Sequence, residues 1–378
     1  MEEQNTTKKY RALGLMCGTS ADGVDVAVID TDGHKVLGLG AAGSHGFDAG
    51  FRQRLRQAMR QAAGLPPTPT PPADFAALAR DLADRHADAI LRTLQDAGVD
   101  LSAIDVVGFH GQTVRHAPDV RLTWQIGDAA HLAARLGRPV VTDFRLADVA
   151  AGGQGAPFVP LYHRALAAGA ASLLYPLAVL NIGGVANITW IEGPGEEDRV
   201  IACDTGPGNA LMDDWLAHHG AGAFDEGGRL AASGTVDDER LTQWLKHPYF
   251  RKPAPKSLDR DDFAHLDMAG LDLTDGLATL AAFTAAAVAL TGGSMPAPPR
   301  QWLVTGGGRH NATLMAMLAN RLNVPVAPVE AVGWRGDVLE AEAFAYLAVR
   351  SQLGLPLSLP GTTGVPYPMP GGRLVMPG

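Results

Sequence analysis

The chain has 378 residues, enough for two domains with separate hydrophobic cores. Its hydrophobic fraction of 46% and charged fraction of 19% are typical of a soluble globular protein. The net charge of −9 argues against a nucleic-acid-binding protein, whose binding domain is normally basic. An acidic substrate stays open, because local basic residues can hold one. The two cysteines, Cys17 and Cys203, allow no disulfide framework and lack metal-site spacing, so we expect packing roles.

The sequence gives no sign of export or of membrane insertion. Its N-terminus, MEEQNTTKKY, is polar and lacks the apolar stretch of a signal peptide. The most apolar predicted helix, Leu277–Leu290, is rich in alanine and is expected to be too short to cross a bilayer. These features predict a cytoplasmic protein.

The first motif is a turn of small residues between two apolar runs. Residues 18–23 read GTSADG, and after them Val24, Val26 and Val28 alternate with polar or small residues, which predicts a β-hairpin. The exposed amides, two hydroxyls and Asp22 suit a phosphate with its Mg²⁺. A plain hairpin turn is the alternative, because Asp-Gly is common in such turns.

Scaffold helices and two histidines follow. Helices are predicted over residues 51–63 and 73–97, joined by the surface connection PPTPTPP. A buried strand over residues 104–109 delivers His110 in HGQT, and His116 comes six residues later. Because no third ligand is near in the sequence, polar site groups or capping residues are favoured over a metal centre.

A basic residue precedes the most glycine-rich loop. The strand over residues 138–142 leads to Asp143-Phe144-Arg145, and the loop AAGGQGAPFVP follows at residues 150–160. Such a loop indicates unusual backbone angles or the close approach of another group. Arg145 suits a ligand carboxylate or phosphate. A surface ion pair with Asp143 or Asp148 is the alternative.

Near residue 177 the opening pattern begins again. Residues 177–189, LAVLNIGGVANIT, predict strand, glycine turn and strand, and residues 200–204 predict a third strand. The N-terminal hairpin has the same outline. Two similar starts half a chain apart predict two related domains, although no strict repeat is present.

Asp204 opens the motif DTGPGN at the predicted end of that third strand. A helix pattern with Leu211, Met212 and Trp215 on one face follows the turn. A carboxylate there, beside the N-terminus of a helix, suits catalysis next to a phosphate. The alternative is that Asp204 only forms the turn or caps the helix.

A second glycine cluster lies between a strand at residues 301–305 and a helix at residues 312–322. The triplet Gly306-Gly307-Gly308 would let a flat ring or a phosphate lie close to the backbone. It does not match G-x-G-x-x-G, and no Walker A motif is present, so a Rossmann dinucleotide site is disfavoured. A last helix is predicted over residues 337–352, with Glu340 near its start.

Nine ordered motifs between about residue 13 and residue 350 resemble those of the anhydro-N-acetylmuramic acid kinase family, within the actin/hexokinase/Hsp70 ATPase superfamily. They are GLMCGTSADGVD, HGQTVRH, QIGD, DFRLADVAAGGQGAPFVP, LNIGGVANIT, DTGPGNALMDDW, PKS, VTGGGRHNATLM and EAEAFAYLA. The resemblance implies an α/β chain of two RNase-H-like domains with a nucleotide cleft between them. We expect the first domain at residues 9–176, joined by residues 351–378, and the second at residues 177–350.

The resemblance also implies an activity. ATP, water and 1,6-anhydro-N-acetylmuramic acid would give ADP and N-acetylmuramic acid 6-phosphate, a step in peptidoglycan recycling. Asp204 would be the base that activates the water, Arg145 and Glu340 would contact the substrate, and Asp22 would hold Mg²⁺ directly or through a water. The expected ATP-binding residues are Gly18, Thr19, Ser20, Ala21, Asp22, Gly23, Val24, Asp25, Gly306, Gly307 and Gly308. The family habit suggests a homodimer, with no nucleic-acid or membrane partner.

The sequence departs from the family pattern at several points. Cys17 replaces a frequent serine, Leu146 and Ala147 stand where several members have arginines, and Leu258-Asp259 replaces a frequent threonine-glycine pair. Two alternative functions stay open on the sequence. One is another sugar kinase of the superfamily, and the other is a nucleotide-gated activator without substrate turnover.

Overall fold

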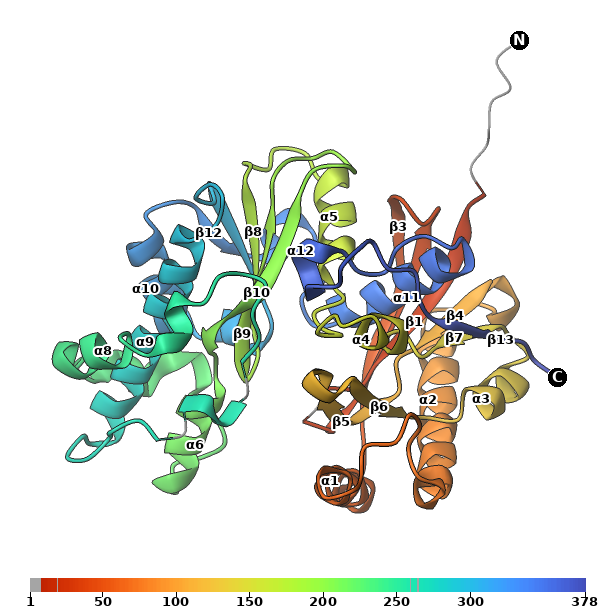
Figure 1. Ribbon diagram of the computed structural model, residues 1–378, viewed down its shortest axis with the longest axis horizontal. Helices are drawn as coiled ribbons and strands as arrows, with labels where there is room; N and C mark the ends of the chain where they lie inside the picture. Colours follow the sequence, from red (N-terminus) through yellow and green to blue (C-terminus); the bar gives the residue numbers. More distant parts are fainter. Residues whose placement is uncertain (1–7, 19, 259, 264) are drawn as a thin grey trace, which may run out of the picture. The chain divides into compact units, whose positions relative to one another are not determined.

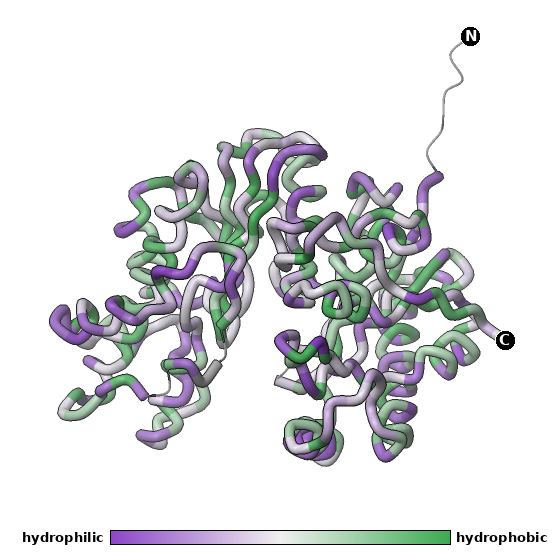
Figure 2. Tube along the Cα trace, viewed as in Figure 1, coloured by the Kyte–Doolittle hydropathy of each residue, from purple (hydrophilic) through white to green (hydrophobic). Residues whose placement is uncertain are grey.

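The computed structural model describes residues 8–18, 20–258, 260–263 and 265–378 (Figure 1). Its chain divides into two compact units. Unit 1 includes the described chain up to Gly169 and the segment Val338–Gly378, and unit 2 comprises Ala170–Asp337. Hydrophobic stretches follow the strands, and hydrophilic residues gather in the outer helices and loops (Figure 2).

Unit 1 is built on a six-stranded sheet with the order β13-β7-β4-β1-β2-β3. Strands β1, β2 and β3 form an antiparallel meander, β4 and β7 run parallel to β1, and β13 closes the edge antiparallel to β7. Strands β5 and β6 form a separate hairpin. The bounds are β1 Tyr10–Met16, β2 Gly23–Thr31, β3 Val36–Gly46, α1 Ala49–Ala63, α2 Ala76–Asp96, β4 Val106–Phe109, β5 Gln112–Ala117, β6 Leu122–Ile126, α3 Ala129–Leu136, β7 Val140–Thr142, α4 Leu146–Ala150, α5 Pro160–Gly169, α11 Leu339–Gln352, α12 Pro360–Thr363 and β13 Arg373–Val375.

Unit 2 repeats the same plan with five strands in the order β10-β9-β8-β11-β12. Again three antiparallel strands come first, and two strands parallel to the first of them follow. This order and these directions are those of an RNase-H-like sheet, so the prediction of two related α/β domains is confirmed. The bounds are β8 Leu177–Ile182, β9 Val185–Ile191, β10 Val200–Pro207, α6 Ala210–His218, α7 Arg229–Ser233, α8 Asp238–Trp244, α9 Leu273–Gly293, β11 Gln301–Thr305, α10 Ala312–Leu322 and β12 Val326–Pro328.

The sheet of unit 1 is covered by helices on both faces (Figure 1). Successive residues of a strand point to opposite faces, and β1 shows this directly. Leu13 and Leu15 join a buried core with Leu82 and Ile90 of α2. Gly14, between them, faces α11, which packs across β1, β2 and β4. Strand β1 therefore connects the two layers.

Helix α11 lies unusually close to the sheet, because two glycines face it. A Cβ on Gly14 would lie 1.9 Å from the backbone oxygen of Ala341, and one on Gly108 would lie 2.2 Å from that of Phe344. These contacts place α11 in unit 1. The sequence-based division at residue 350 assigns the same helix to the second domain, and it differs from the structure on this point. Motif order along the chain could not reveal the packing partner.

Helix α9 corrects a second expectation. It has 21 residues, and by length and composition it could cross a membrane, so the prediction that the apolar helix is too short was wrong. However, 72% of its most apolar window is buried inside the protein. It packs against α6, α7, α8, α10 and β10, and it forms the central helix of unit 2.

We expect the substitution Gly14→Ala to destabilise the protein by about 2 kcal/mol, because the added methyl group must push α11 off β1. Gly38→Ala is the matched control, since a Cβ on that strand glycine would meet nothing closer than 3.7 Å. Urea unfolding of both variants measures the difference. Equal stabilities would contradict the close packing of α11.

Candidate active site

The predicted phosphate-binding hairpin joins β1 to β2 in unit 1. The turn is closed by the backbone N–H of Ala21, which donates to Gly18 O at 3.1 Å, and Ala21 has a left-handed φ of 56°. The side chains of Ala21 and Val24 are buried, so these residues can offer a ligand only their backbone. Gly23, Val24 and Asp25 already belong to β2. Thr19 lies outside the described residues.

Gln112 of the HGQT motif holds the first residues of this hairpin. Its Nε2 donates to Gly18 O at 3.1 Å, and its Oε1 accepts from the Cys17 thiol at 2.7 Å. Burial raises the pKa of Cys17 to about 12, so the thiol stays protonated and acts as a donor. Cys17 therefore fixes the amide of Gln112, a role that the prediction of simple packing did not include.

Two arginines of α1 approach Asp22 at the other end of the hairpin. Arg56 Nη2 lies 3.3 Å from Asp22 Oδ1 and donates to Ser20 O at 3.4 Å. Arg52 Nη1 lies 3.9 Å from the same carboxylate oxygen. All three side chains are exposed, so these ion pairs stabilise the fold little. They do keep positive charge beside the predicted phosphate site.

Arg145 points into the protein and is held by two acceptors. Its Nε donates to His110 Nε2 at 2.8 Å, and its Nη1 donates to Gly155 O at 2.6 Å. The predicted alternative of an ion pair with Asp143 or Asp148 is therefore wrong. Burial lowers the pKa of Arg145 to about 10, while the nearby carboxylates Glu340 and Asp148 oppose this shift.

His110 has a defined protonation state because of this arrangement. An arginine can only donate, so His110 Nε2 must accept, and the proton sits on Nδ1, which faces Gly111 O at 2.8 Å. Burial and the positive charge of Arg145 hold the pKa of His110 well below its usual value. His110 thus orients Arg145 as a neutral acceptor. No group of three metal-ligating side chains occurs in the described parts of the chain.

The GGQG loop is anchored by the buried carboxylate of Asp148. Asp148 accepts from Gly155 N at 2.7 Å, from Ser358 Oγ at 2.5 Å and from Thr363 Oγ1 at 2.6 Å. Two residues beyond the C-terminal end of α11 therefore fix the loop whose Gly155 carbonyl accepts from Arg145. Sequence reasoning missed this role, since Ser358 and Thr363 lie 210 and 215 residues after Asp148 and match no motif.

Glu340 lies in the first turn of α11, within the electrostatic reach of Arg145 and Asp25. Burial raises its pKa, Arg145 lowers it, and the negative charge of Asp25 raises it again. Asp25 in turn accepts from Ser44 Oγ at 2.6 Å. Unit 1 therefore gathers the hairpin carboxylate Asp25 and both predicted substrate residues, Arg145 and Glu340, in one region.

In unit 2, Asp204 lies inside β10, where the ladder shifts register between Asp204 and Gly206. The strand continues to Pro207, so the prediction that it ends at Asp204 is wrong. The N-terminal cap of α6 is Asn209, which removes the cap interpretation of Asp204. A β-bulge commonly aims a side chain at a site, and Asp204 fits this pattern.

The carboxylate of Asp204 is supported by the segment that carries the PKS motif. Leu258 N donates to Asp204 Oδ2 at 2.8 Å, and the backbone N–H of Asp204 donates to Lys256 O at 3.0 Å. Tyr249 Oη donates to Asp204 O at 2.7 Å. Burial raises the pKa of Asp204 to about 6, although the bond from Leu258 and the charge of Lys256 lower it. Asp204 is therefore mainly ionised at neutral pH, and its pKa lies close to the pH at which it would have to accept a proton.

The glycine triplet packs tightly against β8. Gly306 has a φ of 76°, and a Cβ on it would lie 2.3 Å from Asn181 Oδ1 and 2.6 Å from Ile182 O. Arg309 holds the turn by donating from Nη1 to Gly306 O at 2.9 Å while it pairs with Glu330 and Asp337. Only glycine suits this close approach.

A Cβ on Gly307 would lie 3.6 Å from Asn209 Nδ2, an ordinary contact, and a cavity of about 390 Å³ lies beside this glycine. The cavity combines backbone from the triplet with the start of α6 and the loop before α7. Its lining residues are Asn209, Met212, Asp213, Phe224, Asp225, Glu226, Gly227, Gly307, His310 and Asn311. Phe224 is 67% exposed there, so its ring is available to a flat ligand.

Comparison with known proteins decides the family. The family model described as anhydro-N-acetylmuramic acid kinase matches residues 10–375. The chain belongs to this family. It is 56% identical over 372 residues to the anhydro-N-acetylmuramic acid kinase of Acidiphilium cryptum, covering 97% of this chain and 98% of that protein. It is 55% identical to that of Rhodospirillum rubrum, with 96% and 93% covered.

Among solved structures, component A of the (R)-2-hydroxyglutaryl-CoA dehydratase of Acidaminococcus fermentans aligns with a TM-score of 0.46 at 12% identity, covering 90% of this chain and 99% of that one. Membership of the kinase family, shown by the sequence match over nearly the whole chain, favours a kinase over the two alternative functions.

Proposed function

We propose that the protein is an ATP-dependent kinase that opens the bridge of 1,6-anhydro-N-acetylmuramic acid with water and phosphorylates O6, giving N-acetylmuramic acid 6-phosphate for cell-wall recycling. The observation that carries this proposal is Asp204, a strand carboxylate with its pKa raised to about 6, in a chain that matches the family over residues 10–375.

The chemistry needs one base. Water attacks C1, the C1–O6 bond breaks, and O6 takes the γ-phosphoryl group of ATP while ADP leaves. Asp204 would accept the proton of the attacking water, since an ideal base has a pKa near the working pH. The amide of Leu258 fixes one carboxylate oxygen. Lys256 favours the ionised form of the base and keeps it ready before the reaction starts.

We propose ATP-binding residues in each of the two units. The backbone of residues 18–25 in unit 1 would hold the phosphates, with positive charge from Arg52 and Arg56 near Asp22. In unit 2, Gly306–Gly308 would border the adenosine, and the cavity beside Gly307 has a volume suited to a small flat group. Phe224 would stack on the base.

The described residues fit Mg²⁺. This ion usually keeps several waters and uses one or two carboxylates together with substrate phosphates, so a cage of three protein ligands is not expected. Asp22, with its exposed carboxylate at the hairpin, would hold it directly or through a water. When bound, Mg²⁺ neutralises the phosphate charge that builds up during phosphoryl transfer.

Arg145 and Glu340 would bind the sugar. Arg145 is fixed by His110 and Gly155 and keeps one guanidinium nitrogen, Nη2, for which no partner is found among the described residues. That nitrogen suits a carboxylate or another acceptor on the substrate. A cytoplasmic location and a homodimer are part of the proposal, and neither a nucleic acid nor a membrane is proposed as a partner.

We expect Asp204→Asn to keep ATP binding and to lower turnover at least ~100-fold, as for a missing general base. The carboxamide keeps the shape of the side chain but cannot take the proton. Asp238→Asn, an exposed change at the start of α8, is the control and should leave turnover unchanged. Coupled ADP release and nucleotide titration measure both properties. Near-normal turnover of Asp204→Asn would reject its role.

The pH profile provides a second test. Because the pKa of Asp204 is raised to about 6, its proton-accepting form is lost as the pH falls through that value. We expect log(kcat/KM) for the sugar to be flat above pH 7 and to fall with a slope of one below about pH 6. An acid limb near pH 4, where an ordinary aspartate titrates, would contradict the assignment of the base.

A further inference from the structure

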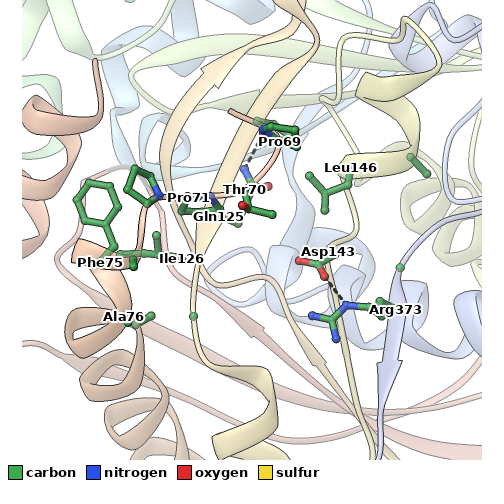
Figure 3. Close-up of a pocket in the computed structure, with 17 residues that line it drawn as sticks. Pro69, Thr70, Pro71, Phe75, Ala76, Gln125, Ile126, Asp143, Leu146 and Arg373 are labelled. Carbon is green, nitrogen blue, oxygen red and sulfur yellow. Dashed lines mark hydrogen bonds and ion pairs between the residues drawn. The ribbon is translucent and has the colours of Figure 1, made fainter. Parts of the chain in front are cut away.

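A second cavity, of about 630 Å³, lies within unit 1 and contains none of the residues assigned to the kinase site (Figure 3). It lies between the proline-rich connection before α2, the end of β6, the start of α4 and β13. Its volume falls within the usual range for small-molecule pockets. The proposed kinase function makes no use of this cavity.

One wall of the cavity is preformed. Pro69, Pro71 and Pro72 have fixed φ angles, which lowers the entropy lost when a ligand orders the wall. The connection is also tied to β5 and β6, because Trp124 Nε1 donates to Thr68 O at 2.7 Å and Arg115 donates to Leu65 O. A segment that the sequence suggests is a plain surface connection therefore forms a rigid side of a pocket.

The lining separates apolar from charged groups. Figure 3 shows Phe75 and Ile126 at one end of the pocket and the pair Asp143–Arg373 at the other. Arg373 Nε lies 2.8 Å from Asp143 Oδ2, and the two side chains are 63% and 28% exposed. For Asp143 Oδ1 and both η nitrogens of Arg373, no hydrogen-bond partner is found within the described chain.

This pair differs from an ordinary surface ion pair in the backbone conformation of Asp143. Asp143 has a φ of 60°, an uncommon left-handed conformation for a residue other than glycine. It turns the carboxylate toward Arg373, whereas Arg145, two residues later, is directed to His110 and Gly155. The pocket is thus separate from the proposed substrate residue, although both belong to the same turn.

We propose that this pocket binds a small zwitterion with an apolar side group, of the class of the free α-amino acids. The α-carboxylate binds the η nitrogens of Arg373, the α-ammonium binds Asp143 Oδ1, and the apolar side group lies against Phe75 and Ile126. The two open sites have opposite charge and lie on neighbouring side chains, as the two charges of an α-amino acid do. A simple anion would meet the carboxylate of Asp143, and a simple cation would meet Arg373.

Calorimetric titration of the full chain with free amino acids tests the class of ligand. We expect L-leucine or L-phenylalanine to bind with a dissociation constant on the order of 0.1–1 mM, as for a ligand of so few atoms. Glycine, which lacks the apolar group, and N-acetyl-L-leucine and L-leucinamide, which each lack one charge, should bind at least tenfold more weakly. No binding of either apolar amino acid at 10 mM, or equal binding of the blocked forms, would overturn the proposal.

Three variants locate the site. Arg373→Gln removes the carboxylate partner, and Ala76→Trp fills the apolar end of the cavity, so each should weaken binding at least tenfold. Arg54→Gln is the matched control, since Arg54 forms a similarly exposed ion pair with Asp81 at 2.7 Å, and it should bind normally. Kinase turnover without added amino acid should stay unchanged in all three variants. Unaltered binding in Arg373→Gln or Ala76→Trp would place the ligand elsewhere and contradict the proposal, whether or not the kinase function holds.

Discussion

The backbone-to-backbone contact between α11 and the sheet of unit 1 is the constraint on which much of this structure depends. Gly14 on β1 and Gly108 on β4 leave no room for side chains beneath the helix. Helix α11 therefore lies in one position only, with Phe344 against the rings of His110 at 4.6 Å and Phe144 at 5.1 Å. His110 orients Arg145, and Glu340 belongs to α11 itself. This packing therefore helps to position both proposed substrate residues.

The same contact explains why the end of the chain matters for the site. After α11, Ser358 and Thr363 donate to Asp148, and Asp148 in turn holds Gly155. Buried hydroxyl and amide donors satisfy the carboxylate, which would otherwise be costly to bury. The glycine loop can then keep its unusual backbone angles without a ligand, so its carbonyl is in place for Arg145.

In unit 2, burial rather than hydrogen bonding sets the state of the carboxylate of Asp204. Asp204 has one firm amide donor and a nearby lysine, but it is largely removed from water, and the desolvation dominates. Its pKa is therefore raised, whereas the pKa of Asp30, a carboxylate that accepts a hydrogen bond from Arg11 and pairs with Lys9, is lowered. A catalytic base needs a desolvated environment like that of Asp204, because a carboxylate stabilised by many donors accepts protons poorly.

Local patterns predicted much of this fold. The strand at Gln301–Thr305 and the helix at Ala312–Leu322 agree with the structure, because apolar periodicity and adjacent glycines define both. Repetition of the hairpin motif correctly predicted two related domains. Long-range packing could not be predicted in this way: the domain of α11 follows from Gly14 and Gly108, whose contacts are visible only in the fold.

The candidate site shows the same limit. Glycine-rich turns and Asp204 stand out in the sequence as candidate site residues, because short motifs contain them. The partners of Arg145 could not be recognised in this way. Asp143 and Asp148 are its neighbours in the sequence, but Arg145 donates to His110 and Gly155 instead. The bulge that carries Asp204 inside β10 also escaped prediction, because residues after it include glycine and proline, which usually end a strand.

The most direct test of the central claim is the path of the oxygen atoms. The protein is incubated briefly with Mg-ATP and 1,6-anhydro-N-acetylmuramic acid in ¹⁸O-water, and the sugar and phosphate products are analysed by mass spectrometry. Unlabelled sugar phosphate kept in ¹⁸O-water for the same time is the control for exchange of the C1 hydroxyl with water. We expect one ADP per sugar phosphate, with ¹⁸O in the C1 hydroxyl and none in the phosphate. Release of ¹⁸O-labelled inorganic phosphate with an intact anhydro sugar would show simple ATP hydrolysis and contradict the proposed reaction.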